Sequence, residues 1–381
     1  MAVAGSPSGP LTPGVRERAR RLVLAHGWNA AAYQILNPGL ALWFAPHDRA
    51  VVGFVRSPGV GGAGRTWVAA GAPVCDEAYV TEAAQRFERD AARDGARVTW
   101  FGADRRLRAA LLPSPEHSEM LLGAQPVWAP DRWAGIVQGK ASLRAQLNRA
   151  RNKGVSVRLL PADAPVPDAL RPVLADWLGF RPMPAMHFMV EPDVLGHVTD
   201  RRVFIAERDV EGDVTPVAYL VASPVPARQG WLIEQIIQGK GRLAPAAPNG
   251  TAALLLDAAM RAAADSGARY VTLGLSPLSQ RTASAAPDDE PLWLRLLLGW
   301  VRLHGRRFYN FGGLEAFKAK FVPDRWDPLT AITTERAPTP LTLYAIADAF
   351  SGPTSPVGLV ARAVGMAARD ESLMLRERLG R

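Results

Sequence analysis

The stretch that decides the fold is Phe308-Tyr309-Asn310-Phe311-Gly312-Gly313-Leu314-Glu315-Ala316-Phe317-Lys318-Ala319-Lys320-Phe321. Leu314, Phe317 and Phe321 recur at the three- and four-residue spacing of one helix face. We therefore expect these three residues, with Phe308 and Phe311, to pack into the core of the protein. The basic residues of the stretch then remain available for a function.

Basic side chains are interleaved with the aromatic ones here. Lys318 and Lys320 stand two residues apart, which separates them by about 200° around a helix, so they should not bind the same phosphate. Arg306 and Arg307 come shortly before them. Cationic groups beside aromatic rings suit a phosphate-bearing partner such as the end of an RNA.

Working outward, the second half of the chain predicts an alternation of strands and helices. In order, it predicts a hairpin around Gly212, a strand at 231–237, a helix at 251–266 that follows the turn Asn249-Gly250-Thr251, and a strand at 270–275. The first half repeats this order, with strands at 42–44, 50–55 and 66–70, a helix at 76–95 and a strand at 97–101. No literal sequence repeat accompanies it.

This element order predicts an α+β fold built as a tandem pair of similar units. We expect a flexible leader at 1–14, a first lobe with a basic connecting helix at 15–158, a second, catalytic lobe at 159–335, and a helical tail at 336–381. The connecting helix carries candidate phosphate-binding residues, namely Arg144, Arg149, Arg151 and Lys153.

Composition narrows the function classes. Of 381 residues, 48% are apolar and 21% are charged, which is typical of a globular protein. The single cysteine, Cys75, excludes a disulfide within the chain and a cysteine-rich zinc site, and His187 and His197 lack metal-ligand spacing. The net charge of +9 suits RNA or anionic lipid, although a composition rich in arginine also produces it.

No stretch predicts a membrane span. The longest apolar runs, 252–264 and 292–301, are shorter than the roughly 20 residues that a spanning helix needs. Any chemistry on a lipid would therefore take place at the membrane surface, and we expect a cytoplasmic protein at the inner face of the cell membrane.

Several motifs together resemble one family. Residues 308–321, followed by Pro323 and Trp326-Asp327-Pro328, are similar to the C-terminal signature of the phosphatidylglycerol lysyltransferases, the multiple peptide resistance factor family. Further similar segments lie around Gly27-Trp28-Asn29, Ala70-Gly71-Ala72-Pro73-Val74, the basic helix at 143–154 and the loop at 272–279. The resemblance covers about residues 27–327.

The resemblance implies a tandem pair of GNAT-like acyltransferase lobes, each a mixed sheet flanked by helices. It also implies an aminoacyl-tRNA donor, a phosphatidylglycerol-type acceptor at the membrane surface, and no cofactor. No protein partner is implied. The substrate-binding residues that we expect from it are Ser276, Tyr309, Asn310, Lys318 and Lys320.

Two departures from the family pattern stand out. Where the family has an aspartate and, three residues later, an arginine, this chain has Glu234 and Ile237. Where the family has a glutamate before its signature, this chain has Arg295, with Glu290 as the nearest acid. An acidic pocket is the physical means of recognising a lysine side chain, so these changes argue against lysine as the transferred amino acid.

An aminoacyl ester is already activated, so its transfer needs only a base and stabilisation of an oxyanion. No Gly-x-Ser-x-Gly elbow is present, which favours direct attack over a covalent intermediate. Glu234 is the candidate base or ammonium ligand, or else a solvated residue at a strand end. Glu234→Gln should then abolish transfer and leave the fold intact. Asn249 and Thr251 either bind an anion at a helix N-terminus or only cap that helix.

Two other functions remain open on the same fold. The turn Gly239-Lys240-Gly241 before a helix is a weak signal for the pyrophosphate of coenzyme A, the cofactor of a GNAT-type N-acyltransferase. Alternatively, Ile237 and Arg295 mark a protein that has lost activity and only binds RNA or a membrane surface.

Overall fold

The computed structural model describes residues 12–62, 64–181, 185–210, 212–287, 290–304, 311–352 and 358. A five-element unit recurs in it. In the first half, β1 (Ala41–Phe44), β2 (Ala50–Ser57) and β3 (Thr66–Ala70) form an antiparallel meander, α2 (Val80–Arg93) follows, and β5 (Arg97–Ala103) lies parallel to β3. Helix α2 packs Phe87 among the rings of Phe54, Trp67 and Trp100.

The second half repeats the unit. Here β8 (Arg202–Val210), β9 (Asp213–Val225) and β10 (Gly230–Gln238) form the meander, α7 (Thr251–Asp265) is the crossover helix, and β11 (Tyr270–Thr272) is parallel to β10. The β8–β9 turn contains Gly212, as expected. The repeat that element order predicted is therefore present in the topology.

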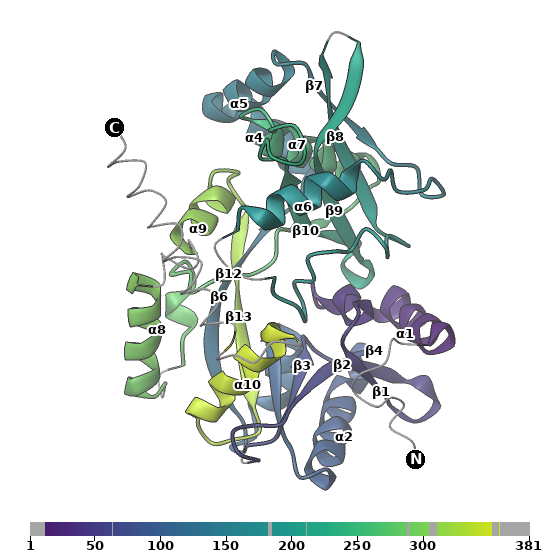
Figure 1. Cartoon of the computed structure of the whole chain (residues 1–381). Coiled ribbons are helices and arrows are strands. Elements are labelled where there is room, and N and C mark those ends of the chain that lie inside the picture. The colour runs from purple at the N-terminus through teal and green to yellow at the C-terminus, as the bar shows by residue number, and fades with distance from the viewer. Residues whose placement is uncertain are drawn as a thin grey trace.

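The strand that follows each unit along the chain pairs with the other unit. Strand β6 (Ser118–Trp128), from the first half, is antiparallel to β11 of the second unit. Strand β13 (Arg325–Thr333), from the end of the chain, lies between β5 and β6. One continuous sheet results, in the order β1-β2-β3-β5-β13-β6-β11-β10-β9-β8-β7, with β7 at Val155–Leu159 (Figure 1). The halves of the sheet consequently do not coincide with the halves of the chain, and the boundaries at 158 and 335 stay predictions.

Helices cover both faces of this mixed sheet, which confirms the α+β class. Near the first unit lie α1 (Pro13–His26), α3 (Arg105–Leu111) and α10 (Pro340–Ser351). Near the second lie α4 (Trp133–Gly139), α5 (Ala141–Arg151) and α6 (Leu170–Gly179), and α8 (Leu292–His304) and α9 (Phe311–Ala319) precede β13 (Figure 1). Two short strands complete the set, β4 (Val74–Cys75) and β12 (Ser276–Pro277).

The sequence pattern did not indicate three of these elements. Strand β13 contains Pro328 and Asp327, which are both disfavoured in strands, but Pro328 sits beside the register shift at Leu329/Thr330. Strand β7 is a short edge strand, and α8 was visible only as an apolar run. Of the tail, α10 is confirmed, whereas 359–381 lies outside the described residues. None of the described helices has the length and apolarity to cross a bilayer.

Helix α7 begins where two backbones nearly touch. Gly250 caps it with φ 101°, and a Cβ at this position would lie 2.2 Å from the Gln146 carbonyl oxygen of α5. Only glycine permits both this backbone conformation and this approach. This contact holds the start of α7 against α5, the basic connecting helix. It thereby fixes the end of the loop that joins β10 to α7.

Candidate functional site

The candidate site opens where β10 and β11 separate. The two strands are paired only from Gly230–Leu232 to Tyr270–Thr272. A bulge at Glu234 follows at once, because Ile233 faces Ala222 while Gln235 already faces Val221. The extra residue bends the strand, and a cavity of about 590 Å³ lies between residues 232–237 of β10 and residues 273–275 after β11.

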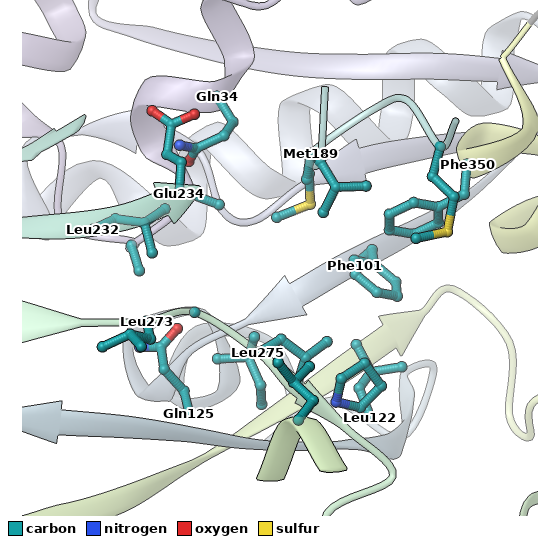
Figure 2. A pocket seen from close by; sticks show the side chains of 18 of the residues that line it. Gln34, Phe101, Leu122, Gln125, Met189, Leu232, Glu234, Leu273, Leu275 and Phe350 are labelled. Atoms are coloured by element: carbon teal, nitrogen blue, oxygen red, sulfur yellow. The ribbon is translucent and has the colours of Figure 1, made fainter. Parts of the chain in front are cut away.

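This cavity is polarised along its length (Figure 2). The polar side chains Gln34, Glu234 and Gln125 all lie toward one end of the view, where Leu232 and Leu273 accompany them, whereas the labelled residues at the other end, Phe101, Phe350 and Leu122, are all apolar. The apolar end continues into α8, α9 and α10 through Leu298, Leu314, Leu343 and Ile346. A cavity with one polar and one apolar end suits an amphipathic ligand.

Glu234 lines the polar end but is already paired. The Arg201 guanidinium, which is fully buried, donates to both carboxylate oxygens at 2.8 and 3.3 Å. Arg201 also donates to the His197 carbonyl and to Asn37. Glu234 is therefore not a solvated strand end; its carboxylate balances a buried cation and keeps unused acceptor capacity.

Two amide oxygens in the same end have no partner among the described residues. The Gln235 side-chain nitrogen donates to the carbonyls of Glu191 and Pro192 at 2.7 and 3.1 Å, which fixes the orientation of its amide. Its oxygen is buried and unpaired, and so is that of Gln34. A buried acceptor without a donor costs about 1–3 kcal/mol. The polar end is thus suited to a ligand that donates hydrogen bonds.

Lys318 is the other unusual group in the cavity wall. It is buried, and its amine donates to the Gly274 and Leu275 carbonyls, both at 2.9 Å. Burial lowers the pKa of this amine to about 7. In the neutral form two N–H bonds satisfy the two carbonyls and the lone pair is left over, which is the arrangement that a proton acceptor requires.

Lys320 points elsewhere, as its spacing from Lys318 predicted. Its amine donates to Gln146 of α5 and lies over the rings of Phe317 and Phe321. Phe321 is fully buried and Phe317 packs against the same core, so the core prediction holds for both. Phe311 and Leu314 instead line the cavity.

The remaining candidates of the second lobe lie outside this cavity wall. Asn249 is exposed before α7. Thr251 is buried, and its hydroxyl donates to the Pro248 carbonyl at 2.7 Å. Ser276 is buried with an unpaired hydroxyl on β12. Tyr309, Asn310, Arg306, Arg307 and Phe308 lie outside the described residues.

The basic connecting helix is α5, and none of its residues lines the cavity, although its Gln146 accepts from Lys320. Arg149 and Lys153 are exposed, Arg144 donates to the Gln138 carbonyl, and Arg151 lies 3.3 Å from Asp257. In the view of Figure 1 the helix is at the top of the molecule, and α8 is at the side, lower down. None of these four residues lines the cavity that holds the catalytic candidates.

The turn Gly239-Lys240-Gly241 is occupied by the protein itself. The buried Asp176 carboxylate accepts the backbone N–H groups of residues 240–243 at 2.6–3.4 Å. Burial opposes its ionisation, but these four donors outweigh burial and lower the pKa of Asp176. The donors that a pyrophosphate would use are therefore already bonded to a carboxylate.

Two residues that depart from the family pattern also have structural positions. Ile237 is buried in the apolar cluster that includes Val173 and Leu174 of α6. Arg295 lies on α8 with its guanidinium 3.9 Å from Glu290.

Within the described residues, no group of three acidic, histidine or cysteine side chains is arranged to hold a metal ion. Burial raises the pKa of the Cys75 thiol to about 12, so it stays protonated.

Sequence reasoning missed Arg201, Gln34 and Gln235. The sequence around Arg201 and around Gln34 is that of an ordinary loop or helix. Their positions along the chain give no sign that they lie beside Glu234. Gln235 carried one signal: it is a polar residue beside Glu234 within an otherwise apolar strand. An adjacent polar pair in a buried strand indicates a bulge that turns both side chains toward one cavity.

The family model described as phosphatidylglycerol lysyltransferase, C-terminal, matches residues 20–330. The chain belongs to this family. This is a family of acyltransferases, and its description names the transfer of an amino acid to a lipid. No curated protein matches the sequence.

Solved structures share the fold of this family member. The C-terminal domain of a putative lysylphosphatidylglycerol synthetase from Agrobacterium fabrum is 22% identical with a TM-score of 0.69, covering 88% of this chain and 97% of that one. L-PGS from Bacillus licheniformis is 18% identical with a TM-score of 0.70, covering 92% and 99%. FemX is 9% identical with a TM-score of 0.52, covering 89% and 99%.

Proposed function

We propose that this chain transfers a neutral amino acid from an aminoacyl-tRNA to a hydroxyl of phosphatidylglycerol or a related glycerolipid. The polarised cavity carries the proposal. Its polar end offers acceptors for the ammonium group of the donor, and its apolar end offers a surface for the chains of a lipid. Lys318, whose amine is bonded to the Gly274 and Leu275 carbonyls, also lines this cavity.

The ammonium group of the donor fits the polar end. An aminoacyl ester carries three N–H donors at this group, and the unpaired oxygens of Gln34 and Gln235 with the Glu234 carboxylate supply acceptors. A second cation has little support there. Of the two glutamates that line the cavity, Glu234 is paired with Arg201 and Glu191 with His187. A lysyl side chain would therefore lose hydration without gaining a free carboxylate.

The chemistry needs one proton transfer in each direction. The neutral Lys318 amine accepts the proton of the lipid hydroxyl as its oxygen attacks the ester carbonyl. The C–O bond to the terminal ribose of the tRNA then breaks, and the protonated amine returns the proton to the ribose oxygen. The products are an aminoacylated lipid and free tRNA. The exposed basic residues in and just after α5, above all Arg149 and Lys153, are suited to the phosphates of the tRNA.

A transfer assay tests this function. Purified protein, a single radiolabelled aminoacyl-tRNA and phosphatidylglycerol vesicles are incubated, and the lipids are then extracted and separated. Label should enter the lipid from a neutral amino acid and much less from lysine. Lys318→Met should remove most of the transfer activity, whereas Lys240→Met, at an exposed lysine outside the cavity, should not.

The coenzyme A alternative is tested in the same preparation. Since Asp176 occupies the donors of the glycine-containing turn, we expect no coenzyme A binding by calorimetry. A folded protein that binds coenzyme A and transfers no amino acid to lipid would contradict the proposal and support the N-acyltransferase. A folded protein that does neither would support a non-catalytic binding function.

A further inference from the structure

Helix α8 exposes an apolar face. Leu292, Leu296 and Trp300 follow one another at four-residue spacing and are 66%, 65% and 61% exposed. Trp293 and Leu297, next to them on the helix, are also exposed. Five large apolar side chains on one surface helix exceed the scattered exposure that soluble surfaces normally show.

The opposite face of α8 anchors the helix to the molecule. Leu294 is fully buried against Met120 and Ala331, and Leu298 packs beside this cluster. Leu298 also lines the cavity of the candidate site. The helix is therefore held in place by the apolar contacts of its inner face.

Basic residues lie on the flank between these two faces. Arg295 and Arg302 are seven residues apart, so they project within about 20° of each other. Both line a second cavity of about 670 Å³, which shares Leu121, Leu278 and Leu298 with the first. Glu290 is 3.9 Å from Arg295, whose side chain is still more than half exposed, and α8 itself contains no acidic residue.

We propose that α8 docks this protein onto an anionic bilayer. The helix lies in the plane of the lipid interface, with Leu292, Leu296 and Trp300 among the acyl chains and Arg295 and Arg302 at the phosphates. This inference rests on the proposed function in one respect: the bilayer is taken to supply the acceptor lipid.

Three features favour a bilayer over a protein partner. Leucine and tryptophan on one side with arginine at the edge is the composition of interfacial helices. The 13-residue helix is about 20 Å long, enough to lie on a membrane but not to cross it. Finally, Leu298 on the inner face of this helix lines the cavity, so docking through the outer face places the apolar end of the cavity about one helix diameter from the acyl chains.

Flotation with vesicles tests the docking. The full chain is mixed with phosphatidylcholine vesicles with and without phosphatidylglycerol, at low and high salt. We expect preferential binding to the anionic vesicles, weakened by salt. Leu296→Glu combined with Trp300→Glu should lower the vesicle affinity by about tenfold or more. The matched control is Leu243→Glu, at an equally exposed leucine in the loop after β10, which should bind like wild type.

A second variant separates charge from apolar contact. Arg302→Glu should reduce the preference for anionic vesicles and the salt dependence, with less effect on neutral vesicles. Unchanged melting curves establish that each variant is folded. Equal flotation of wild type and the α8 double variant would overturn the proposal. So would a dimer in gel filtration that the double variant dissociates while vesicle binding is unaffected.

A soluble acceptor lipid distinguishes failure of the proposed function from failure of the docking proposal. With short-chain phosphatidylglycerol below its micelle concentration, wild type and the α8 double variant should transfer amino acid at similar rates. No transfer by either protein would count against the proposed function, and flotation would still decide the docking by itself.

Discussion

Lys318 combines two properties that rarely occur together in a lysine. Its amine is held by two carbonyl oxygens, so its position is fixed, and its burial brings its pKa to about 7. A lysine with this pKa exchanges protons readily near neutral pH. The sequence marked Lys318 as a candidate through the family resemblance, but its chemistry comes from burial by segments distant in the chain.

The pH dependence of the rate should report this amine. Transfer needs neutral Lys318, so kcat/KM should rise with pH through an apparent pKa near 7 and then level off. Lys318→Met should remove most of the activity and this rise together. A residual rate in Lys318→Met that keeps the same pH profile would assign the titration to another group.

The stability of the protein should depend on the same group. The unfolded chain keeps a proton on this lysine up to its ordinary pKa of 10.5, and the folded protein only up to about 7. Unfolding therefore takes up a proton between these values, and the free energy of unfolding gains about 1.4 kcal/mol per pH unit from this site as pH rises. Denaturation of wild type and Lys318→Met from pH 7 to 10 isolates the contribution, and parallel curves would refute it.

Glu234 needs a revised expectation, because its carboxylate balances the buried Arg201. Glu234→Gln leaves that cation without its charge partner and should lower the free energy of unfolding by about 3–5 kcal/mol. Adding Arg201→Met should recover part of the loss, as a double-mutant cycle in urea would measure. A fully stable Glu234→Gln protein would restore the simpler role as a base.

Among the elements, the junction of α5 and α7 best shows what a sequence pattern reveals and what it conceals. The turn Asn249-Gly250-Thr251 predicted the start of α7 correctly, because glycine and a following apolar run are local signals. The close approach to Gln146 is invisible locally, since that residue lies about a hundred positions upstream. The bulge at Glu234 likewise involves more than the local sequence. Strand β10 was predicted, but the bulge within it depends on how β10 pairs with β9.

Gly250→Ala should therefore destabilise the protein by roughly 3 kcal/mol, because a positive φ and a clash with a carbonyl oxygen combine there. Gly212 is the matched control, since its φ is 90° but nothing lies within 4 Å of an added Cβ. Gly212→Ala should cost only about 1 kcal/mol. Equal losses in thermal melts of the two variants would show that the contact at Gln146 is unimportant.

For the whole molecule, the exchange of β6 and β13 makes the two units interdependent. Sequence order predicted two consecutive lobes because each unit has local signals for its own strands. It did not predict the exchange, since pairing between β5 and β13 joins segments from opposite parts of the chain and leaves no local pattern. The arrangement also separates the surfaces of α5 and α8, because α5 lies at the top of the molecule and α8 at its side in the view of Figure 1.

A fragment of residues 12–163 should not fold alone, because without β13 the neighbouring edges of β5 and β6 have no hydrogen-bonding partner. We expect it to be insoluble or to unfold without a cooperative transition. Co-expression with residues 164–352 should produce a complex that purifies together. A cooperative melt of the isolated first fragment would show that β13 is dispensable.

The position of β13 also has a consequence for how a cell makes this protein. The ribosome releases β5 and β6 early, and the strand that must fill the gap between them emerges only near the end of synthesis. During most of translation the nascent chain therefore displays two open strand edges, which are prone to association with other chains. A premature stop before Arg325 would yield a polypeptide that chaperones can protect but that has no native state to reach.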